Sequence, residues 1–107
     1  LVLGVSYKRN VGDLRESPGM EIMQLMKERG AEVDYSDPYI REVTQTRKLN
    51  ITSSSVQLSS SMLARYDVVI LVTDHDVFDY DLIQASSPLL VDTRGRYRGR
   101  YANVVHA

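Results

Sequence analysis

The sequence predicts an α/β fold, with a Rossmann-like, doubly wound and mainly parallel sheet in three layers. Strand-like apolar runs alternate along the chain with helical segments, which is the pattern of parallel α/β sheets. The strongest of these runs are apolar at consecutive positions, as in strands that are buried on both faces. A chain of 107 residues, 43% of them hydrophobic, builds one core, so we expect residues 1–107 to form one domain.

The first expected element is a strand over residues 1–6, which are mostly apolar. A helix is expected over residues 19–29, because Ser17 suits the N-cap and Pro18 suits the first helical position. Gly30 then ends this helix. Five apolar side chains at helical spacing are expected to share its buried face: Met20, Ile22, Met23, Leu25 and Met26.

The next segments are weaker. Residues 31–36 alternate enough to predict a second strand, which Asp37 and Pro38 end. Residues 41–61 are polar, and they predict a loop with one short strand near residues 49–52 and a short helix over residues 59–64.

The second half of the chain begins with the strongest strand signal, at residues 67–73. This run is apolar on both faces, so we expect it at the centre of the sheet. A short helix over residues 80–85, a buried strand over residues 89–92 and a final strand over residues 101–106 complete the alternation.

Composition excludes several classes of protein. A net charge of −1 argues against a nucleic-acid binder and gives no reason to expect a membrane surface. The absence of cysteine excludes disulfides and zinc–thiolate sites and favours a cytoplasmic location. No apolar run reaches the ~18 residues of a membrane span. Because the chain starts without Met inside a strand-like run, we expect a domain cut from a longer protein.

The loop between the first strand and the first helix predicts an anion site. It carries Lys8, Arg9 and Arg15 and leads into a helix N-terminus, at the sheet edge where α/β folds collect ligands. Two structural alternatives remain, namely a solvated Lys8 and an ion pair of Arg15 with a neighbouring carboxylate. The G-x-G-x-x-G pattern of a dinucleotide site is absent here, which argues against NAD binding by this loop alone.

Two further clusters follow later strands. Residues 94–100 place four arginines among glycine and tyrosine, which suits an anion site shared with Lys8, a solvated loop or, less well, single-stranded nucleic acid. His75 stands between Asp74 and Asp76, but adjacent side chains on a loop diverge. We therefore expect a structural or capping His75 and no metal site. No nucleophile with a base and an orienting group is visible, so we expect no catalytic residue in this chain.

Several motifs together resemble the C-terminal domain of the UDP-glucose/GDP-mannose dehydrogenase family. They are Leu3-Gly4-Val5-Ser6-Tyr7-Lys8, Asp13-Leu14-Arg15-Glu16-Ser17-Pro18, Gly30-Ala31-Glu32-Val33, Asp37-Pro38-Tyr39, Thr73-Asp74-His75 and Asp92-Thr93-Arg94. The resemblance covers nearly the whole chain. It implies a role in an enzyme that oxidises C6 of a nucleotide sugar to a carboxylate with two NAD, in polysaccharide biosynthesis.

The resemblance also implies a division of labour. An N-terminal domain would hold NAD, a central helix would build a homodimer or higher oligomer, and residues 1–107 would bind the UDP-sugar. Tyr7, Lys8 and Arg94 match residues that contact the UDP-sugar, and Arg15 matches one that reaches toward NAD. Arg96, Arg98 and Arg100 have no assigned role. The wording of the motifs favours the UDP-N-acetylhexosamine branch over UDP-glucose or GDP-mannose. The alternatives are a non-catalytic flavodoxin-like regulatory module and an oligomerisation module.

Overall fold

Five short parallel strands form the central sheet of the computed structural model, which describes residues 1–14, 17–43 and 53–107. The strands are β1 (Val2–Leu3), β2 (Tyr35–Ser36), β5 (Val69–Leu71), β6 (Leu90–Asp92) and β7 (Val104–His106). Their order in the sheet is β2-β1-β5-β6-β7, and every pair is parallel. The chain order therefore reverses between β1 and β5, which makes a topological switch point.

Both faces of the sheet are buried. Leu1 and Leu3 point into one core and Val2 points into the other, and β5 alternates in the same way. One core holds Leu1, Leu3, Leu63, Val69, Leu71, Phe78, Ile83, Leu90 and Tyr97. The other holds Val2, Val5, Met20, Met23, Tyr35, Ile40, Val43 and Val72. The expected central place of the strongest strand is confirmed, since β5 lies in the middle of the sheet.

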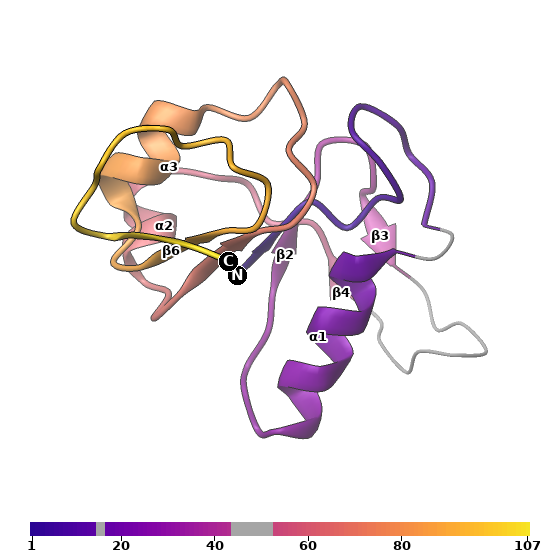
Figure 1. Cartoon of the computed structure of the whole chain (residues 1–107). Helices are drawn as coiled ribbons and strands as arrows, with labels where there is room; N and C mark the ends of the chain where they lie inside the picture. Colours follow the sequence, from indigo (N-terminus) through magenta and orange to yellow (C-terminus); the bar gives the residue numbers. More distant parts are fainter. Residues whose placement is uncertain (15–16, 44–52) are drawn as a thin grey trace.

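The helices divide between these faces, as Figure 1 shows. Helix α1 (Pro18–Glu28) supplies Met20 and Met23 to one core, while α2 (Ser60–Ala64) and α3 (Tyr80–Ser86) supply Leu63 and Ile83 to the other. The arrangement confirms the three-layer α/β fold. Within the described ranges, no helix is long and apolar enough to cross a membrane.

The start of α1 is as the sequence predicts. Ser17 is the N-cap, its hydroxyl accepts a hydrogen bond from the N–H of Met20 at 3.3 Å, and Pro18 is the first helical residue. The same hydroxyl donates to the carbonyl oxygen of Val5. The cap therefore fixes the helix to the segment that follows β1.

One prediction for α1 is wrong. Leu25 does not share the buried face, because its side chain is 55% exposed. Five residues advance a helix by about 140° beyond a full turn, so Leu25 lies well round the helix from Met20. The buried face of α1 therefore holds fewer than the five apolar side chains expected. Met20 and Met23 are buried on it, and Ile22 is partly buried beside them.

The polar middle of the chain forms a small second sheet. Strands β3 (Glu42–Val43) and β4 (Ser53–Ser54) pair antiparallel, which the sequence did not predict. Val43 is fully buried and joins this pair to the core beneath α1. The strand predicted at residues 49–52 lies outside the described residues. Helix α2 is confirmed, with Ser59 as its N-cap.

Two glycines allow the elements near β1 to pack closely. Gly4 has a φ of +84°, and a Cβ atom there would lie 2.3 Å from the carbonyl oxygen of Thr73. A Cβ on Gly19 would lie 2.7 Å from the carbonyl oxygen of Gly4. The chain after β5 and the start of α1 thus press against the carboxyl end of β1.

Candidate functional site

The loops after β1 and β5 meet at the switch point of the sheet, where open α/β folds bind their ligands. The guanidinium of Arg9 donates to the carboxylate of Asp74 at 2.6 Å. The Asn10 amide donates to Asp76 at 2.8 Å, and the N–H of Asp76 donates back to Asn10 at 2.9 Å. These contacts join residues more than sixty positions apart into one surface.

A buried carboxylate, Asp37, supports this surface from below. One of its oxygens accepts hydrogen bonds from the N–H groups of Val5 at 2.8 Å and Ser6 at 3.1 Å and lies 2.9 Å from Nε2 of His75. The other oxygen accepts the N–H of Tyr39 at 2.8 Å. Burial alone would raise the pKa of Asp37, but these hydrogen bonds outweigh burial and lower it. The carboxylate therefore joins the ends of β1, β2 and β5.

The contacts of His75 define its tautomer. Its Nδ1 accepts the N–H of Asn10 at 2.8 Å, so the proton of the neutral ring is on Nε2, which faces Asp37 and the hydroxyl of Ser6 at 2.9 Å. The ring is fully buried. Asn10 has a φ of +62°, a left-handed conformation that asparagine tolerates better than most residues. The structural role expected for His75 is confirmed: it holds the loop that carries Lys8.

Asp74 is surrounded by guanidinium groups. Besides Arg9, it lies 3.4 Å from Nε of Arg94 and 3.7 Å from a terminal nitrogen of Arg96. Its side chain is only 4% exposed, whereas those of Arg9, Arg94 and Arg96 are 50%, 51% and 33% exposed. Burial would raise the pKa of Asp74, but the hydrogen bond from Arg9 and the nearby positive charges lower it. The result is a carboxylate covered by a cationic surface, which we call the arginine cluster (Arg9, Arg94 and Arg96).

The loop after β6 is shaped to present its arginines. The carboxylate of Asp92 accepts the N–H groups of Arg94 and Tyr97, each at 2.8 Å. The guanidinium of Arg96 lies over the ring of Tyr80, 4.2 Å from its centroid, and pairs with Asp76 at 3.5 Å. Arg96 had no role in the sequence analysis, and the structure places it in the cluster.

The sequence-predicted residues divide as follows. Arg94 lies in the arginine cluster, and Lys8 immediately precedes Arg9 on the same exposed loop. Tyr7 is 49% exposed at this edge. In the part of the chain that the structure describes, no carboxylate pairs with the Lys8 ammonium. Arg15 lies outside the described residues.

Sequence reasoning missed Asp74 and gave Arg9 no role of its own. The signal that identifies them is the strand order, because the loops after β1 and β5 become neighbours only when these strands pair. Among the described residues, no group of three or more His, Cys, Asp or Glu side chains could hold a metal ion.

The described glycines of the loop after β1 do not offer the close backbone approach that the pyrophosphate of a dinucleotide needs. Such a site needs open space beside its glycines, and the space beside Gly4 is filled by Thr73. Gly12 is likewise closed, because a Cβ there would lie 3.0 Å from the carbonyl oxygen of Tyr39. In the described part of this loop, the space beside Gly4 and Gly12 is therefore occupied by the protein itself.

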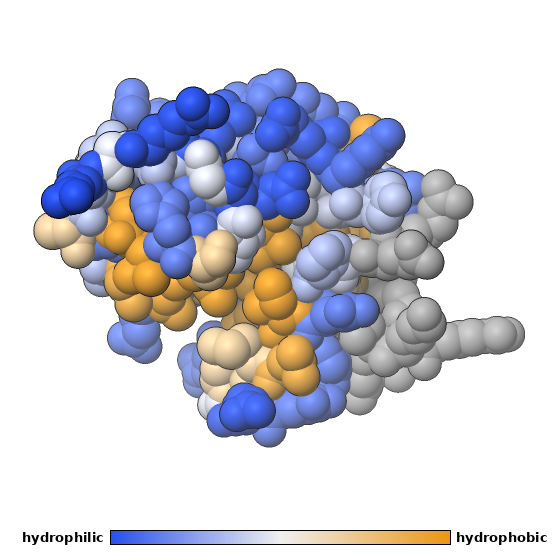
Figure 2. Space-filling view, in the orientation of Figure 1, coloured by the Kyte–Doolittle hydropathy of each residue, from blue (hydrophilic) through white to orange (hydrophobic). Residues whose placement is uncertain are grey.

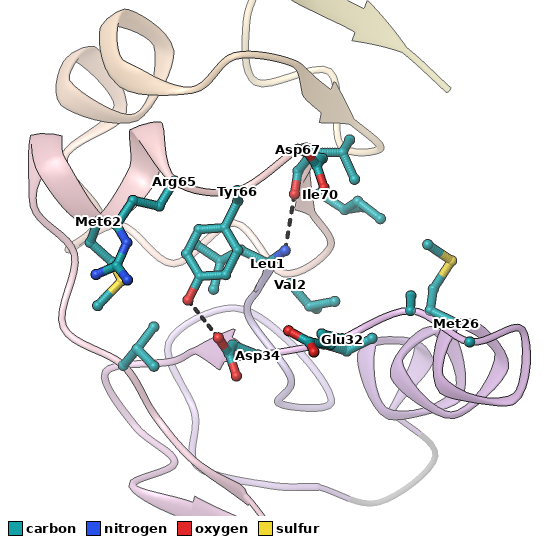
Figure 3. A pocket seen from close by; sticks show the side chains of 15 residues that line it. Leu1, Val2, Met26, Glu32, Asp34, Met62, Arg65, Tyr66, Asp67 and Ile70 are labelled. Atoms are coloured by element: carbon teal, nitrogen blue, oxygen red, sulfur yellow. Dashed lines mark hydrogen bonds between the residues drawn. The ribbon is translucent and has the colours of Figure 1, made fainter.

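A cavity of about 730 Å³ lies at the opposite edge of the sheet, beside the amino ends of β1, β2 and β5. Figure 3 shows Tyr66 and Asp34 within it, joined by a hydrogen bond of 2.7 Å, with Val2 and Ile70 nearby. Figure 2 shows apolar side chains gathered between α1 and the rest of the molecule on this face. The cavity holds none of the cationic residues of the arginine cluster.

Comparison with known proteins identifies the family. Residues 1–99 match the family model described as "UDP-glucose/GDP-mannose dehydrogenase family, UDP binding domain". The chain belongs to this family. The resemblance seen in the sequence motifs is thereby confirmed.

Curated relatives agree. A UDP-glucose 6-dehydrogenase from Rhizobium meliloti is 32% identical over 102 residues, which are 91% of this chain and 23% of the relative. An NDP-N-acetyl-D-galactosaminuronic acid dehydrogenase from Ralstonia nicotianae is 35% identical over 103 residues, 91% of this chain and 22% of the relative. The family domain thus spans about a quarter of the length of these relatives.

Solved structures support the fold. A UDP-D-ManNAc dehydrogenase from Pyrococcus horikoshii superposes with a TM-score of 0.71 over 98% of this chain and 23% of its own, at 21% identity. A UDP-N-acetyl-mannosamine dehydrogenase from Staphylococcus aureus gives a TM-score of 0.68 over 98% of this chain and 24% of its own, at 22% identity. The α/β fold predicted from the sequence is therefore shared with these enzymes.

Proposed function

We propose that this chain is the C-terminal, nucleotide-sugar-binding domain of an NAD-dependent UDP-sugar 6-dehydrogenase. The observation that carries the proposal is a cationic surface at the switch point of the sheet, in a chain that belongs to this family. The diphosphate of a UDP-sugar carries the negative charge that such a surface recognises. The relatives named above act on UDP-glucose or on N-acetylated sugar nucleotides, which supports the substrate class.

The proposed roles follow from position. Lys8 and Arg94 hold the charged part of the UDP-sugar, and Tyr7 lies against it with its exposed ring. Arg15 reaches toward NAD. The nicotinamide cofactor supplies the hydride acceptor of the oxidation and is held mainly by another part of the protein; the occupied space beside Gly4 and Gly12 supports this division. This chain supplies no catalytic residue.

In this proposal the domain acts through binding. The energy gained at the nucleotide, far from the reacting carbon, is used to orient C6 against groups in other domains of the same polypeptide. We propose a UDP-N-acetylhexosamine as the preferred substrate, in line with the Ralstonia relative. We further propose that the enzyme works as a homodimer or a higher oligomer.

Calorimetric titration of the protein at its natural length with UDP tests the proposal. Lys8→Ala and Arg94→Ala should each weaken binding roughly tenfold to a hundredfold, because each removes a charge-assisted contact of about 1.5–3 kcal/mol. Arg98→Ala is the matched control, since Arg98 is exposed on the same loop but lies outside the arginine cluster. Unchanged isotherms for Lys8→Ala and Arg94→Ala would refute the assignment of these two residues to UDP binding.

The preferred sugar requires a separate measurement. The ratio of kcat/KM for UDP-N-acetylglucosamine or UDP-N-acetylmannosamine to kcat/KM for UDP-glucose should exceed one. A ratio below one would transfer the proposal to UDP-glucose without affecting the nucleotide site.

A further inference from the structure

One carboxylate, Asp74, is shared by three arginines that come from two different loops. Arg9 follows β1, whereas Arg94 and Arg96 follow β6, and all three lie within 3.7 Å of Asp74. Asp74 itself follows β5, between those two strands in the sheet. Without this carboxylate, three like charges would face one another across the edge of the sheet.

Among the described residues, few of the guanidinium donors of the cluster have a hydrogen-bond partner. The contact with Asp74 is made by a terminal nitrogen in Arg9 and in Arg96 and by Nε in Arg94, and the Arg96 nitrogen also pairs with Asp76. A guanidinium has five N–H donors, so each arginine has more donors than these contacts use. In Arg94 both terminal nitrogens remain, which is the pair that binds phosphate oxygens in a bidentate manner.

The carboxylate of the cluster is buried, whereas its arginines are partly exposed. Asp74 is covered, and its Oδ1 has no hydrogen-bond partner within the described residues, although the guanidinium of Arg94 is nearby. The arginine side chains are one-third to one-half exposed. A ligand that approaches from solvent therefore meets the guanidinium groups before it meets the carboxylate.

The charges of the surface are not balanced. Among the described residues, Asp74 pairs with three arginines and Asp76 with one of them, Arg96, so the arginines outnumber these two carboxylates, and Lys8 next to Arg9 adds a further positive charge. A ligand with two or more negative charges on adjacent groups, such as a diphosphate, matches this surplus. A ligand with one negative charge matches only part of it.

We propose that Asp74 is an internal counter-anion that holds Arg9, Arg94 and Arg96 in place, and that Arg9 and Arg96 bind the diphosphate together with Arg94. The inference rests on the proposed function and extends it to residues that the family motifs do not assign. Asp74 acts as a positioning residue. Its removal leaves three guanidinium groups that must be ordered when the ligand binds, and this ordering weakens binding.

Removal of the negative charge of Asp74 tests the positioning role, because positioning and simple electrostatics predict opposite changes in anion binding. In the protein at its natural length, we expect Asp74→Asn to weaken binding of UDP and of inorganic pyrophosphate by about fivefold or more, although the variant is more positively charged. Asp81→Asn makes the same charge change at an exposed carboxylate on α3 that pairs with no arginine of the cluster, and it should leave binding within about twofold of wild type or tighten it. Equal or tighter binding by Asp74→Asn would overturn the positioning role.

A second pair of variants tests the additional ligands. Arg9→Gln and Arg96→Gln should each weaken pyrophosphate binding by about tenfold. Arg98→Gln and Arg100→Gln remove the same charge from exposed positions of the same loop and should stay within about twofold of wild type. If all four variants behave alike, a diffuse positive field explains binding and the inference fails. Because these arginines are at the surface, their variants decide the question even if Asp74→Asn does not fold.

The two proposals fail in different ways. If pyrophosphate shows the expected variant pattern but UDP binds no more tightly than pyrophosphate, the arginine cluster is an anion site and the UDP-sugar function is wrong. If UDP binding depends on Lys8 and Arg94 but not on Arg9, Arg96 or Asp74, the UDP-sugar function stands and this inference is wrong.

Discussion

Replacement of Asp37 should destabilise the fold more than replacement of any residue on the surface of the site. Its carboxylate accepts hydrogen bonds from Val5, Ser6 and Tyr39 and contacts Nε2 of His75, and it is 2% exposed. Asp37→Ala leaves the N–H groups of Val5 and Ser6 without an acceptor in fully buried residues. Each unsatisfied buried donor costs about 1–3 kcal/mol, so we expect a loss on the order of 3–5 kcal/mol.

Asp37→Asn separates hydrogen bonding from charge. The amide oxygen can take the position of Oδ2 and keep its three partners, but the amide nitrogen then faces the N–H of Tyr39. We therefore expect Asp37→Asn to destabilise by about 1–3 kcal/mol, less than Asp37→Ala. Urea denaturation that compares the midpoints of wild type and both variants measures the difference. A loss below about 1 kcal/mol for Asp37→Ala would refute the reasoning.

The pH dependence provides an independent check. The pKa of Asp37 is lowered from its ordinary value of 3.8, so its stabilising contribution is present above that pH and is lost as the pH falls below it. Asp37→Asn cannot titrate at this position. The free energy difference between wild type and this variant should therefore shrink as the medium is acidified below pH 3.8. A difference that stays constant would contradict the assignment.

Three further predictions concern backbone, helix cap and tyrosines. Gly4→Ala should lower the free energy of unfolding by roughly 3 kcal/mol or more, because the added Cβ would clash with Thr73. Gly95→Ala is the control, since Gly95 is also at positive φ but has no atom within 4 Å of the added Cβ, and it should cost only about 1 kcal/mol. Equal decreases in melting temperature for the two variants would contradict this prediction. Ser17→Ala should destabilise the fold by about 1 kcal/mol through loss of the α1 cap, with Ser60→Ala, at an exposed residue of α2 that is not an N-cap, as the control. Burial raises the pKa of Tyr35, Tyr66 and Tyr80 from 10.0 to about 12, so the unfolded state ionises first and stability should fall as the pH rises from 10 to 12. Absorbance titration measures the ionisation of the tyrosines. Ionisation of Tyr35, Tyr66 and Tyr80 near pH 10 in the folded protein would contradict this prediction.

Features encoded over a few residues were predictable from the sequence. Ser17 and Pro18 placed the start of α1, and the continuous apolar run around residues 69–71 placed β5 at the centre of the sheet. Both signals act locally, through capping geometry and through burial on two faces. The antiparallel pair β3–β4 was missed because its four residues include Glu42 and two serines, and Val43 is its only strongly apolar member.

Part of the candidate site could not be predicted because it depends on the order of the strands. Arg94 and Lys8 carry motif signals, so the sequence alone proposes them as ligands of the UDP-sugar, and this assignment stays a prediction. Arg9 becomes a partner of Asp74 only through the pairing of β1 with β5. Arg96 depends on Tyr80, which comes from the start of α3. No periodicity or spacing in the sequence encodes such contacts between distant residues.

The hydrogen bonds between the loops after β1 and β5 have a consequence for folding kinetics. Arg9 and Asp74 are 65 positions apart, and Asn10 and Asp76 are 66 apart, so these contacts close very long loops. Loop-closure entropy must be overcome before such distant contacts add stability, and folds that depend on them fold slowly. β1 has only two residues and β5 only three. We therefore expect the cationic surface to form only in the last step of folding, so that the recovery of diphosphate binding during refolding follows complete assembly of the sheet.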